Sequence, residues 1–477
     1  MMKTAIFATL VAFVATAGFA QEPSPIGGHI ESTIVTPTGW NDDYNYQTLS
    51  TELKLTADLA GPDAGLYGEV FFTADDLAGA GDLRQKLSIR PGEIYLSLFL
   101  GRMDLTVGHQ MIAWGSVDAL SPTDIVNPVD LSDLTNLAAT DSEDVRIPVN
   151  ALRVNLYPVD SFRLEGVFLP VFTAAGTPDI TAYLPPELAG IAVSFETPST
   201  ELSSFEAGGR ASLYLRGVDL SLSYLYTWDD IPDIQSVGVA QQEIGGGITF
   251  GSPTSLGFSH NRMHVIGTGF AWPVFGLDLR GEAAYYITED IDGTDVFVKN
   301  PYLSYTLQAG YELFGRLQAN VIFSQKIISN FAEISDYDYS IDPTDPTSWN
   351  QTDAYYQEAY AVNFGPLVSN QRAQFMSSIM LILQQSFLDE YLDASFAGLY
   401  NFPADHDDSD GNTPYGDFVI MPMLEYQIAD SFNISVGANL FFSFAENADG
   451  EIVSDQYSTF GLVDDEDSFF LRARFSF

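Results

Sequence analysis

The sequence predicts an all-β fold, namely a transmembrane antiparallel β-barrel of about 18 strands, with 16 as the alternative count. Three observations support this prediction. Apolar and polar residues alternate with a period of two along much of the chain. Short turns alternate with long connections between the alternating segments. Beyond the N-terminal segment, no run of about 18 apolar residues offers a transmembrane helix.

Segment 275–287 shows the alternation clearly. Its apolar residues at 275, 277, 279, 283, 285 and 287 alternate with Asp278, Arg280 and Glu282. Such a strand has charge on one face and bulky apolar groups on the other. The charged face requires water, whereas the apolar face requires a protein core or lipid.

Eighteen segments carry this pattern. They span residues 27–37, 46–58, 64–74, 92–99, 102–109, 149–157, 161–170, 207–216, 218–228, 262–271, 275–287, 302–311, 314–326, 372–384, 389–400, 417–427, 431–443 and 468–477. The long connections are 110–148, 170–206, 229–261, 288–300, 327–371, 401–416 and 444–467. Long loops on one rim and short turns on the other are typical of bacterial outer-membrane barrels. Lipid offers no hydrogen-bond partners, so a sheet in a membrane must close on itself. A soluble β-sandwich is the alternative interpretation.

The N-terminal segment 1–20 predicts a cleavable secretory signal. Lys3 precedes a short apolar run, and the small residues Gly18 and Ala20 precede Gln21. We therefore expect residues 21–477 to form one barrel that resides in the bacterial outer membrane after cleavage.

The last segment, 468–477, ends on alternating aromatic residues. Its pattern resembles the C-terminal signal that the assembly machinery of bacterial outer-membrane barrels recognises. Phe469, Phe475 and Phe477 lie on its apolar face and are the candidate residues of that signal. An ordinary edge strand that ends in Phe is the alternative.

The composition excludes several classes of function. There are 19 basic and 64 acidic residues, a net charge of −45, which opposes binding to nucleic acid. The absence of cysteine excludes disulfides, thiolate zinc sites and cysteine nucleophiles. The five histidines form no recognisable nucleophile constellation, so we expect neither an enzyme nor a bound cofactor.

Acidic and basic residues occupy different parts of the chain. More than half of the acidic residues lie in the seven long connections, whereas most basic residues lie in the strands. The strand arginines fall on the face opposite the apolar one, which predicts a lumen lined by Arg153, Arg210, Arg216, Arg280, Arg316, Arg472 and Arg474. Such a pore would have an acidic mouth and would select charged solutes. Structural ion pairs between these arginines and neighbouring carboxylates are the alternative interpretation, and both can hold together.

The acidic loops also suggest divalent cations that bridge loops or lipopolysaccharide phosphates. Residues 405–411 come close to a calcium-binding loop, but His406 replaces a carboxylate. The candidate Ca²⁺ ligands are Asp405, Asp407, Asp408 and Asp410. A solvated run of charge is the alternative.

The stretch 101–148 contains a recognisable set of residues. It has a Gly-Arg pair with a later Gly, a Trp-Gly pair, an Asn-Pro-x-Asp segment and a Pro before the next strand, at Gly101, Arg102, Gly108, Trp114, Gly115, Asn127, Pro128, Asp130 and Pro148. These features resemble the domain of unknown function 1302, a family of Gram-negative outer-membrane barrels. Elsewhere the resemblance amounts to barrel-like alternation. It implies a porin-like or substrate-transport barrel without a defined solute.

The connection 110–148 follows the fifth predicted strand and is therefore the third external loop when the connections on that rim are counted from the first strand. In general porins, which the chain resembles in topology, the third external loop folds inward and narrows the pore. The resemblance therefore implies a constriction that brings Asp118, Asp124, Asp130 and Asp133 opposite the strand arginines. A loop packed over the barrel wall for stability is the alternative.

These observations predict a porin-like channel for small polar solutes. A transporter of hydrophobic compounds is one alternative. A structural or adhesive barrel that acts through its external loops is another, suggested by the aromatic residues of 327–371. Expected partners are outer-membrane lipid, lipopolysaccharide and the barrel assembly machinery. The resemblance to porins also implies a homotrimer, with a monomer as the alternative.

Overall fold

A computed structural model describes residues 25–37, 48–75, 86–130, 132, 145–176, 190–333, 336–337, 339, 344–403, 413–447, 449–454 and 458–477. The predicted signal peptide 1–20, Asp133 and the acidic run 405–410 lie outside the described residues.

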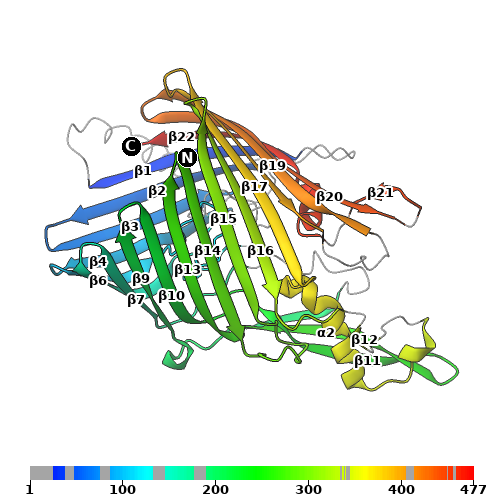
Figure 1. Cartoon of the computed structure of the whole chain (residues 1–477). Helices are drawn as coiled ribbons and strands as arrows, with labels where there is room; N and C mark the ends of the chain where they lie inside the picture. Colours follow the sequence, from blue (N-terminus) through cyan, green and yellow to red (C-terminus); the bar gives the residue numbers. More distant parts are fainter. Residues whose placement is uncertain are drawn as a thin grey trace, which may run out of the picture.

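Eighteen antiparallel strands of the described residues form a closed barrel (Figure 1). They are β1 (Ile26–Pro37), β2 (Thr48–Ala60), β3 (Ala64–Ala74), β4 (Leu87–Phe99), β5 (Met103–Gln110), β6 (Val149–Val159), β7 (Phe162–Leu169), β9 (Glu206–Leu215), β10 (Val218–Trp228), β13 (Arg262–Val274), β14 (Leu277–Thr288), β15 (Tyr302–Leu313), β16 (Leu317–Ile328), β17 (Phe375–Phe387), β18 (Leu392–Asn401), β19 (Thr413–Ala429), β20 (Phe432–Glu446) and β22 (Ser468–Ser476). Each pairs with its neighbours along the chain, and β1 pairs with β22 to close the cylinder. The predicted strand number and antiparallel barrel are confirmed.

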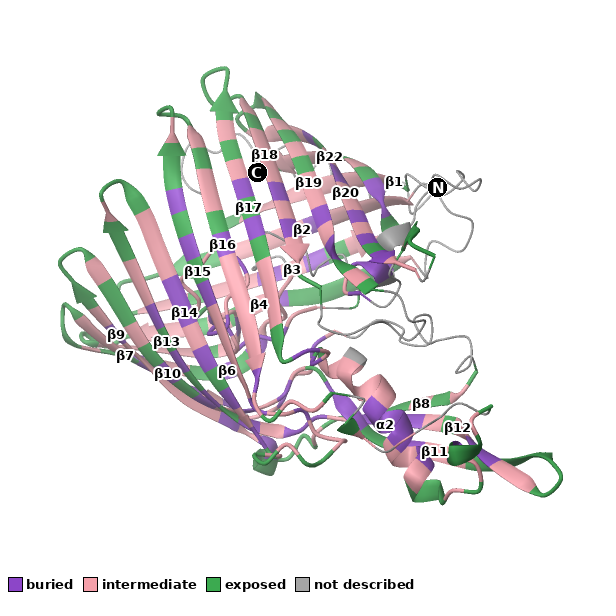
Figure 2. Cartoon of the chain, turned by 45° about the vertical axis from the view of Figure 1, so that its right-hand side comes forward, coloured by how far each residue is buried: buried purple, intermediate pink, exposed green. Residues whose placement is uncertain are grey.

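The two faces of the barrel wall differ as the alternation predicts. On β17, Ile379 and Leu381 point outward and are 38% and 37% exposed, whereas Met380 between them is 1% exposed. Figure 2 shows the same alternation of buried and exposed residues along β14, β15, β16 and β17. Closure pairs the backbone N–H and C=O groups at both edges of the sheet, and apolar side chains cover its outer face. A sheet with both properties can lie in the hydrocarbon region of a membrane.

The short turns between strands are tight. Phe275 and Gly276 join β13 to β14 with φ values of 53° and 83°. Positive φ at both central residues matches the twist of the flanking strands. Strand β9 ends one residue earlier than predicted, and β16 begins three residues later than predicted. Arg216 and Arg316 lie in such turns and are exposed, so the structure does not place them along the lumen wall as predicted.

A small subdomain stands outside the barrel at the end that carries the long connections (Figure 1). It contains β8 (Ala192–Glu196), β11 (Asp233–Gly245), β12 (Ile248–Ser259) and α2 (Asp353–Ser369). The strands form a separate sheet in which β12 pairs with both β11 and β8. Tyr356 and Tyr360 of α2 pack on this sheet with Phe250 and Phe258. The aromatic residues of 327–371 thus contribute to a packed core, and the sequence did not predict these elements.

The shorter elements are β21 (Ile452–Val453) and the 3-10 helices η4 (Leu202–Ser204), η6 (Pro346–Ser348) and η7 (Gly461–Glu466). Among the described residues, no helix combines the length and apolar character needed to cross a membrane.

Candidate functional site: the segment inside the barrel

Residues 111–130 follow β5 and lie within the lumen; they are called the inner segment below. Two buried side chains of the segment hold its backbone. Asn127 Oδ1 accepts a hydrogen bond from Ile112 N at 2.7 Å, and Asp124 Oδ1 accepts one from Trp114 N at 2.9 Å. Asp124 also pairs with Arg146 Nε at 2.9 Å. Asp124 is 6% exposed, so it fastens the segment and does not face the lumen as predicted.

Trp114 fixes the segment to the wall formed by β6, β7 and β10. Its ring is 1% exposed and packs in a cluster with Val149, Val167 and Leu225. Its Nε1 donates to Glu165 on β7 at 3.0 Å. The tryptophan thus combines apolar burial with a satisfied ring N–H.

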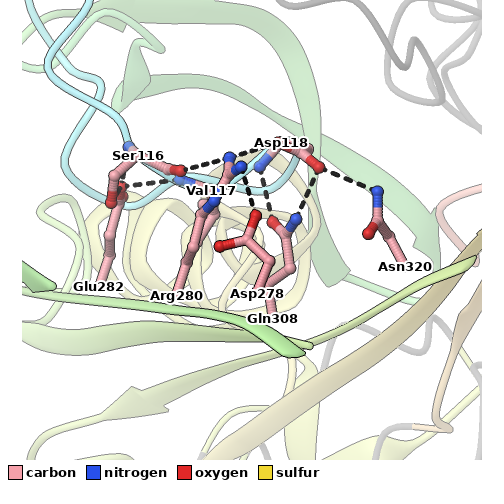
Figure 3. Close-up of polar contacts among 8 residues, drawn as sticks. All are labelled: Ser116, Val117, Asp118, Asp278, Arg280, Glu282, Gln308 and Asn320. Atoms are coloured by element: carbon pink, nitrogen blue, oxygen red, sulfur yellow. Dashed lines mark hydrogen bonds and ion pairs between the residues drawn. The ribbon is translucent and has the colours of Figure 1, made fainter. Parts of the chain in front are cut away.

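Glu282 on β14 holds the middle of the segment (Figure 3). Its carboxylate accepts hydrogen bonds from the amide and hydroxyl of Ser116, the amide of Val117, and the hydroxyls of Ser121 and Thr123. The hydroxyl contacts measure 2.7 Å, 2.5 Å and 2.7 Å for Ser116, Ser121 and Thr123. Among the described residues, this part of the inner segment pairs with no strand that could accept hydrogen bonds from its amides. The carboxylate of Glu282 accepts those of Ser116 and Val117 instead.

Asp118 forms the centre of a second polar cluster (Figure 3). Arg280 Nη1 lies 2.7 Å from its carboxylate, and Gln308 Nε2 and Asn320 Nδ2 donate to it at 2.6 Å and 3.1 Å. Arg280 also pairs with Asp278 at 2.5 Å. Asp118 and Arg280 are each about one-third exposed. A predicted carboxylate of the segment thus meets a predicted strand arginine.

The inner segment continues to the far wall. Thr306 Oγ1 donates to the carbonyl of Leu120 at 2.6 Å, and Tyr286 donates to the carbonyl of Pro122 at 2.7 Å. Ala119 and Leu120 pack against an apolar cluster on β16 to β20. The segment therefore contacts both halves of the barrel, so inward folding and packing on the wall occur together.

The remaining predicted arginines have different surroundings. Arg153 pairs with Glu165, which also pairs with Arg163, while Arg210 makes no hydrogen bond or ion pair with the described residues. Arg472 and Arg474 both pair with Glu31, at 3.3 Å and 2.7 Å, across the closing seam. Asp130 accepts hydrogen bonds from Ser132, and its backbone bridges to Gly176.

Three contributors to the site were not among the predicted lumen residues. Glu282 lies on β14 with the predicted Arg280, whereas Arg163 and Glu165 lie on β7, where Glu165 pairs with the predicted Arg153 of the adjacent strand β6. The period of two could have found them, because Arg163 and Glu165 stand two residues apart, as do Arg280 and Glu282.

A buried ion cluster lies between the barrel and the outer subdomain. Lys299 Nζ lies 2.5 Å from Asp229 and 3.5 Å from Asp233. Burial alone would lower the pKa of Lys299, but the two carboxylates raise it above its usual value. Burial also raises the pKa of Asp233, opposed by Lys299, and lowers that of His260 nearby. Asp233 lies on β11, so the cluster links the outer subdomain to the connection that carries Lys299.

Within the described residues, no group of three or more His, Asp and Glu side chains is placed to hold a metal ion. The candidate Ca²⁺ ligands Asp405, Asp407, Asp408 and Asp410 lie outside the described residues.

Comparison with known proteins decides the family. The family described as protein of unknown function, DUF1302, matches residues 32–477. This chain belongs to the DUF1302 family. The match extends the resemblance seen around residues 101–148 to the whole barrel.

Solved porins have structures similar to this DUF1302 protein. Acinetobacter baumannii OccAB4 has a TM-score of 0.49 at 10% identity, covering 95% of this chain and 97% of the other. Pseudomonas aeruginosa OccK3 (OpdO) has a TM-score of 0.49 at 10% identity, covering 95% of each chain. P. aeruginosa OccK2 (OpdF), solved in complex with glucuronate, has a TM-score of 0.49 at 9% identity, covering 95% and 97%. No curated protein matches the sequence.

Proposed function

We propose that this DUF1302 protein is an outer-membrane, porin-like channel through which small polar solutes diffuse. The main supporting observation is a closed cylinder with an apolar outer belt and charged side chains on its inner face. Lipid excludes water from the outer face, so the charged inner groups require a water-filled lumen.

Opposed charges inside the lumen support a preference for polar solutes. Arg280 faces Asp118, and Arg153 and Arg163 face Glu165. Fixed opposite charges create a field across the lumen that orients water and dipolar solutes. The predicted acidic mouth adds an outer field that raises the local concentration of cations.

The apolar inner residues argue against a route for hydrophobic compounds. The clusters on β16 to β20 and on β6, β7 and β10 are covered by Leu120, Trp114 and other residues of the chain. Their buried members are at most 9% exposed. These surfaces are used for internal packing, so the charged surfaces are the ones available to solutes.

We also propose lipopolysaccharide and the barrel assembly machinery as partners, with Phe469, Phe475 and Phe477 as the assembly signal. Trimer formation, Ca²⁺ binding by the outer loops and removal of residues 1–20 stay predictions from the sequence.

Planar bilayers test the channel and the role of the inner segment together. The folded wild-type protein should conduct ions in single, reproducible steps. Glu282→Ala removes five hydrogen bonds to the inner segment, each worth about 1 kcal/mol, and should give larger and noisier steps.

Glu425→Ala is the matched control for this substitution. Glu425 on β19 also accepts side-chain hydrogen bonds, from Asn433 and Ser435 of the adjacent strand, and contacts no residue of the inner segment through them. Its step size should equal that of the wild type. Correctly folded protein that passes no current would overturn the proposed function.

A further inference from the structure

The inner segment covers only part of the barrel wall. Its apolar residues join three clusters, and the wall residues of these clusters come from β6, β7 and β10, from β13, β14 and β15, and from β16 to β20. Phe460 and Val463, next to or within η7, cover the last of these walls further. Phe460 N donates to Asp417 at 2.8 Å, and Phe441 N donates to Asp467 at 2.6 Å. Two inward segments thus occupy the space against β6 to β20.

The covered wall is apolar because of strand register. Ile322, Met380, Leu399, Val419 and Phe441 are consecutive cross-strand partners from β16 to β20. Each is at most 4% exposed. This row leaves no room for a solute between the wall and the segments that cover it.

The opposite wall is formed by β22, β1, β2, β3 and β4 and is called the open arc below. Within the described part of the chain, residues 112–129 make no hydrogen bond to these five strands and join no apolar cluster with them. Glu93 on β4 does accept a hydrogen bond from Met111 N at 2.6 Å, where the segment leaves β5. The segment then turns away toward β6 to β20.

The open arc carries charged side chains that are exposed to the lumen. Arg90 is 56% exposed, and Arg474 and Arg472 are 43% and 37% exposed. Glu52, which lies 3.8 Å from Arg90, is 28% exposed. On the opposite side, Glu165 is only 3% exposed beneath Trp114, and Asp118 and Arg280 are 35% and 30% exposed but bind each other.

We infer that solutes cross the barrel along the open arc, off the barrel axis, and that Arg90 is a specificity-determining residue of this route. The inference rests on the proposed channel function and adds the location of its passage. This route differs from the constriction expected from the sequence, which lies between Asp118 and the arginines of β6 to β14. There, Arg280 binds Asp118, and Arg153 pairs with Glu165.

The local structure holds Arg90 in place as a fixed charge. Its guanidinium lies 3.8 Å from the centre of the Phe71 ring, and Lys54 Nζ lies 5.0 Å from the same ring. Lys54 in turn pairs with Glu69 at 2.8 Å. A cation–π contact stabilises the position of a guanidinium modestly. The face of the guanidinium turned away from the ring stays accessible to a solute.

The absence of cysteine makes single-cysteine labelling a direct test. Arg90→Cys should react with a bulky, neutral methanethiosulfonate reagent, and the reaction should remove more than half of the single-channel conductance. Gln384→Cys is the matched control, since Gln384 is exposed near the short-turn end of β17. It should react fully, as measured by mass, with a much smaller loss of current.

Met380→Cys completes the set because Met380 is 1% exposed under the inner segments. It should stay unlabelled in the folded protein. The reversal potential in a salt gradient should also shift toward cations in Arg90→Gln and shift less in Arg153→Gln.

The outcomes separate the two proposals. Equal block at positions 90 and 384, or labelling and block at position 380, would place the passage elsewhere while leaving the channel intact. A folded, labelled protein without any current would instead reject the channel itself, and the location of its passage with it.

Discussion

The carboxylate of Glu282 shows how one side chain can position a loop inside a barrel. A loop has backbone N–H groups without strand partners, and a buried unpaired N–H group costs about 1–3 kcal/mol. Glu282 accepts from two such amides and from three hydroxyls of the same stretch. A single carboxylate therefore contributes five of the hydrogen bonds that hold residues 116–123.

At the same scale, the buried cluster of Lys299 gives a stability prediction. Lys299→Met leaves Asp229 and Asp233 buried without their cation, which should cost about 3–5 kcal/mol. Hydrogen exchange of the amides of β11 and β12 should show an opening free energy lower by this amount. Glu243→Gln at the exposed end of β11 is the control and should change it by less than about 0.5 kcal/mol.

His260 gives a prediction of pH dependence. Burial lowers its pKa, and its Nδ1 donates to the carbonyl of Asp229 at 2.7 Å. A lowered pKa means that the unfolded state binds the proton more tightly. The stabilisation is therefore present above the ordinary His pKa of 6.5 and is lost as pH falls through the lower folded value.

Proteolysis of the outer subdomain measures this effect. Cleavage should accelerate between neutral pH and about pH 5, and this acceleration should be smaller in His260→Asn. Protonation of Asp230 and Asp233, whose pKa values are raised by burial, acts in the opposite direction in both proteins. An identical pH profile for the two proteins would show that His260 does not control the transition.

Some residues of the site could be predicted from sequence and some could not. Asp118 was expected opposite the strand arginines, which include Arg280, because strand parity gives the inward face and the resemblance to general porins implies an inward third loop. Asp124 was expected in the lumen but is turned into the segment by Trp114 N and Arg146. The path of the inner segment in space determines which of its carboxylates accepts a hydrogen bond from its own backbone. The spacing of the aspartates in the sequence does not specify that path.

At the scale of elements, strands were easier to predict than the outer subdomain. Most barrel strand pairs keep one register over their whole length, so the period of two is easy to follow, and the exceptions are β3 with β4, β6 with β7 and β19 with β20. The pairing of β11 and β12 contains three register shifts, which break that period. Helix α2 lies in a loop rich in aromatic residues and contains Pro366. Its clearest local signal is Thr352, whose side chain accepts from Tyr355 N at its start.

The contact between α2 and the hairpin can be tested at one glycine. A Cβ on Gly251 would come within 2.3 Å of the Tyr356 ring, so Gly251→Ala should separate α2 from β12 and cost about 1–3 kcal/mol. Limited proteolysis should then cleave α2 faster, with the barrel still folded by its heat-dependent gel mobility.

Gly68→Ala is the control for this substitution. Nothing lies within 4 Å of a Cβ built on Gly68, which is also in a strand. It should leave the cleavage rate unchanged. Equal cleavage of both variants and the wild type would show that α2 does not depend on this contact.

At the scale of the whole molecule, closure joins segments far apart in the chain. Gly28 and Phe477 exchange backbone hydrogen bonds of 3.1 Å and 3.0 Å, and Arg474 reaches Glu31 across the same seam. The eighteen strands were predictable, because each obeys a local pattern. Their closure was predictable only as a requirement of the membrane, because no sequence pattern states which strand meets the first.

The last strand carries the prediction for assembly. Phe477→Ala should lower the fraction of protein that reaches the folded, heat-modifiable form, because it removes an outward aromatic residue of the proposed assembly signal. Phe470→Ala changes the same residue type on the inward face of β22, beside Gly437, and should lower it less. Equal yields from the two variants would argue against the signal.

The attachment of residues 111–130 to both sides has a mechanical consequence. A ring of eighteen strands joined only to neighbours can flatten toward an ellipse at low cost. Trp114 packs on β6, β7 and β10, and Leu120 packs on β16 to β20. The segment therefore connects two separate parts of the wall and resists a change in the distance between them. Cutting the backbone between these two residues should therefore make the cross-section of the whole barrel easier to deform.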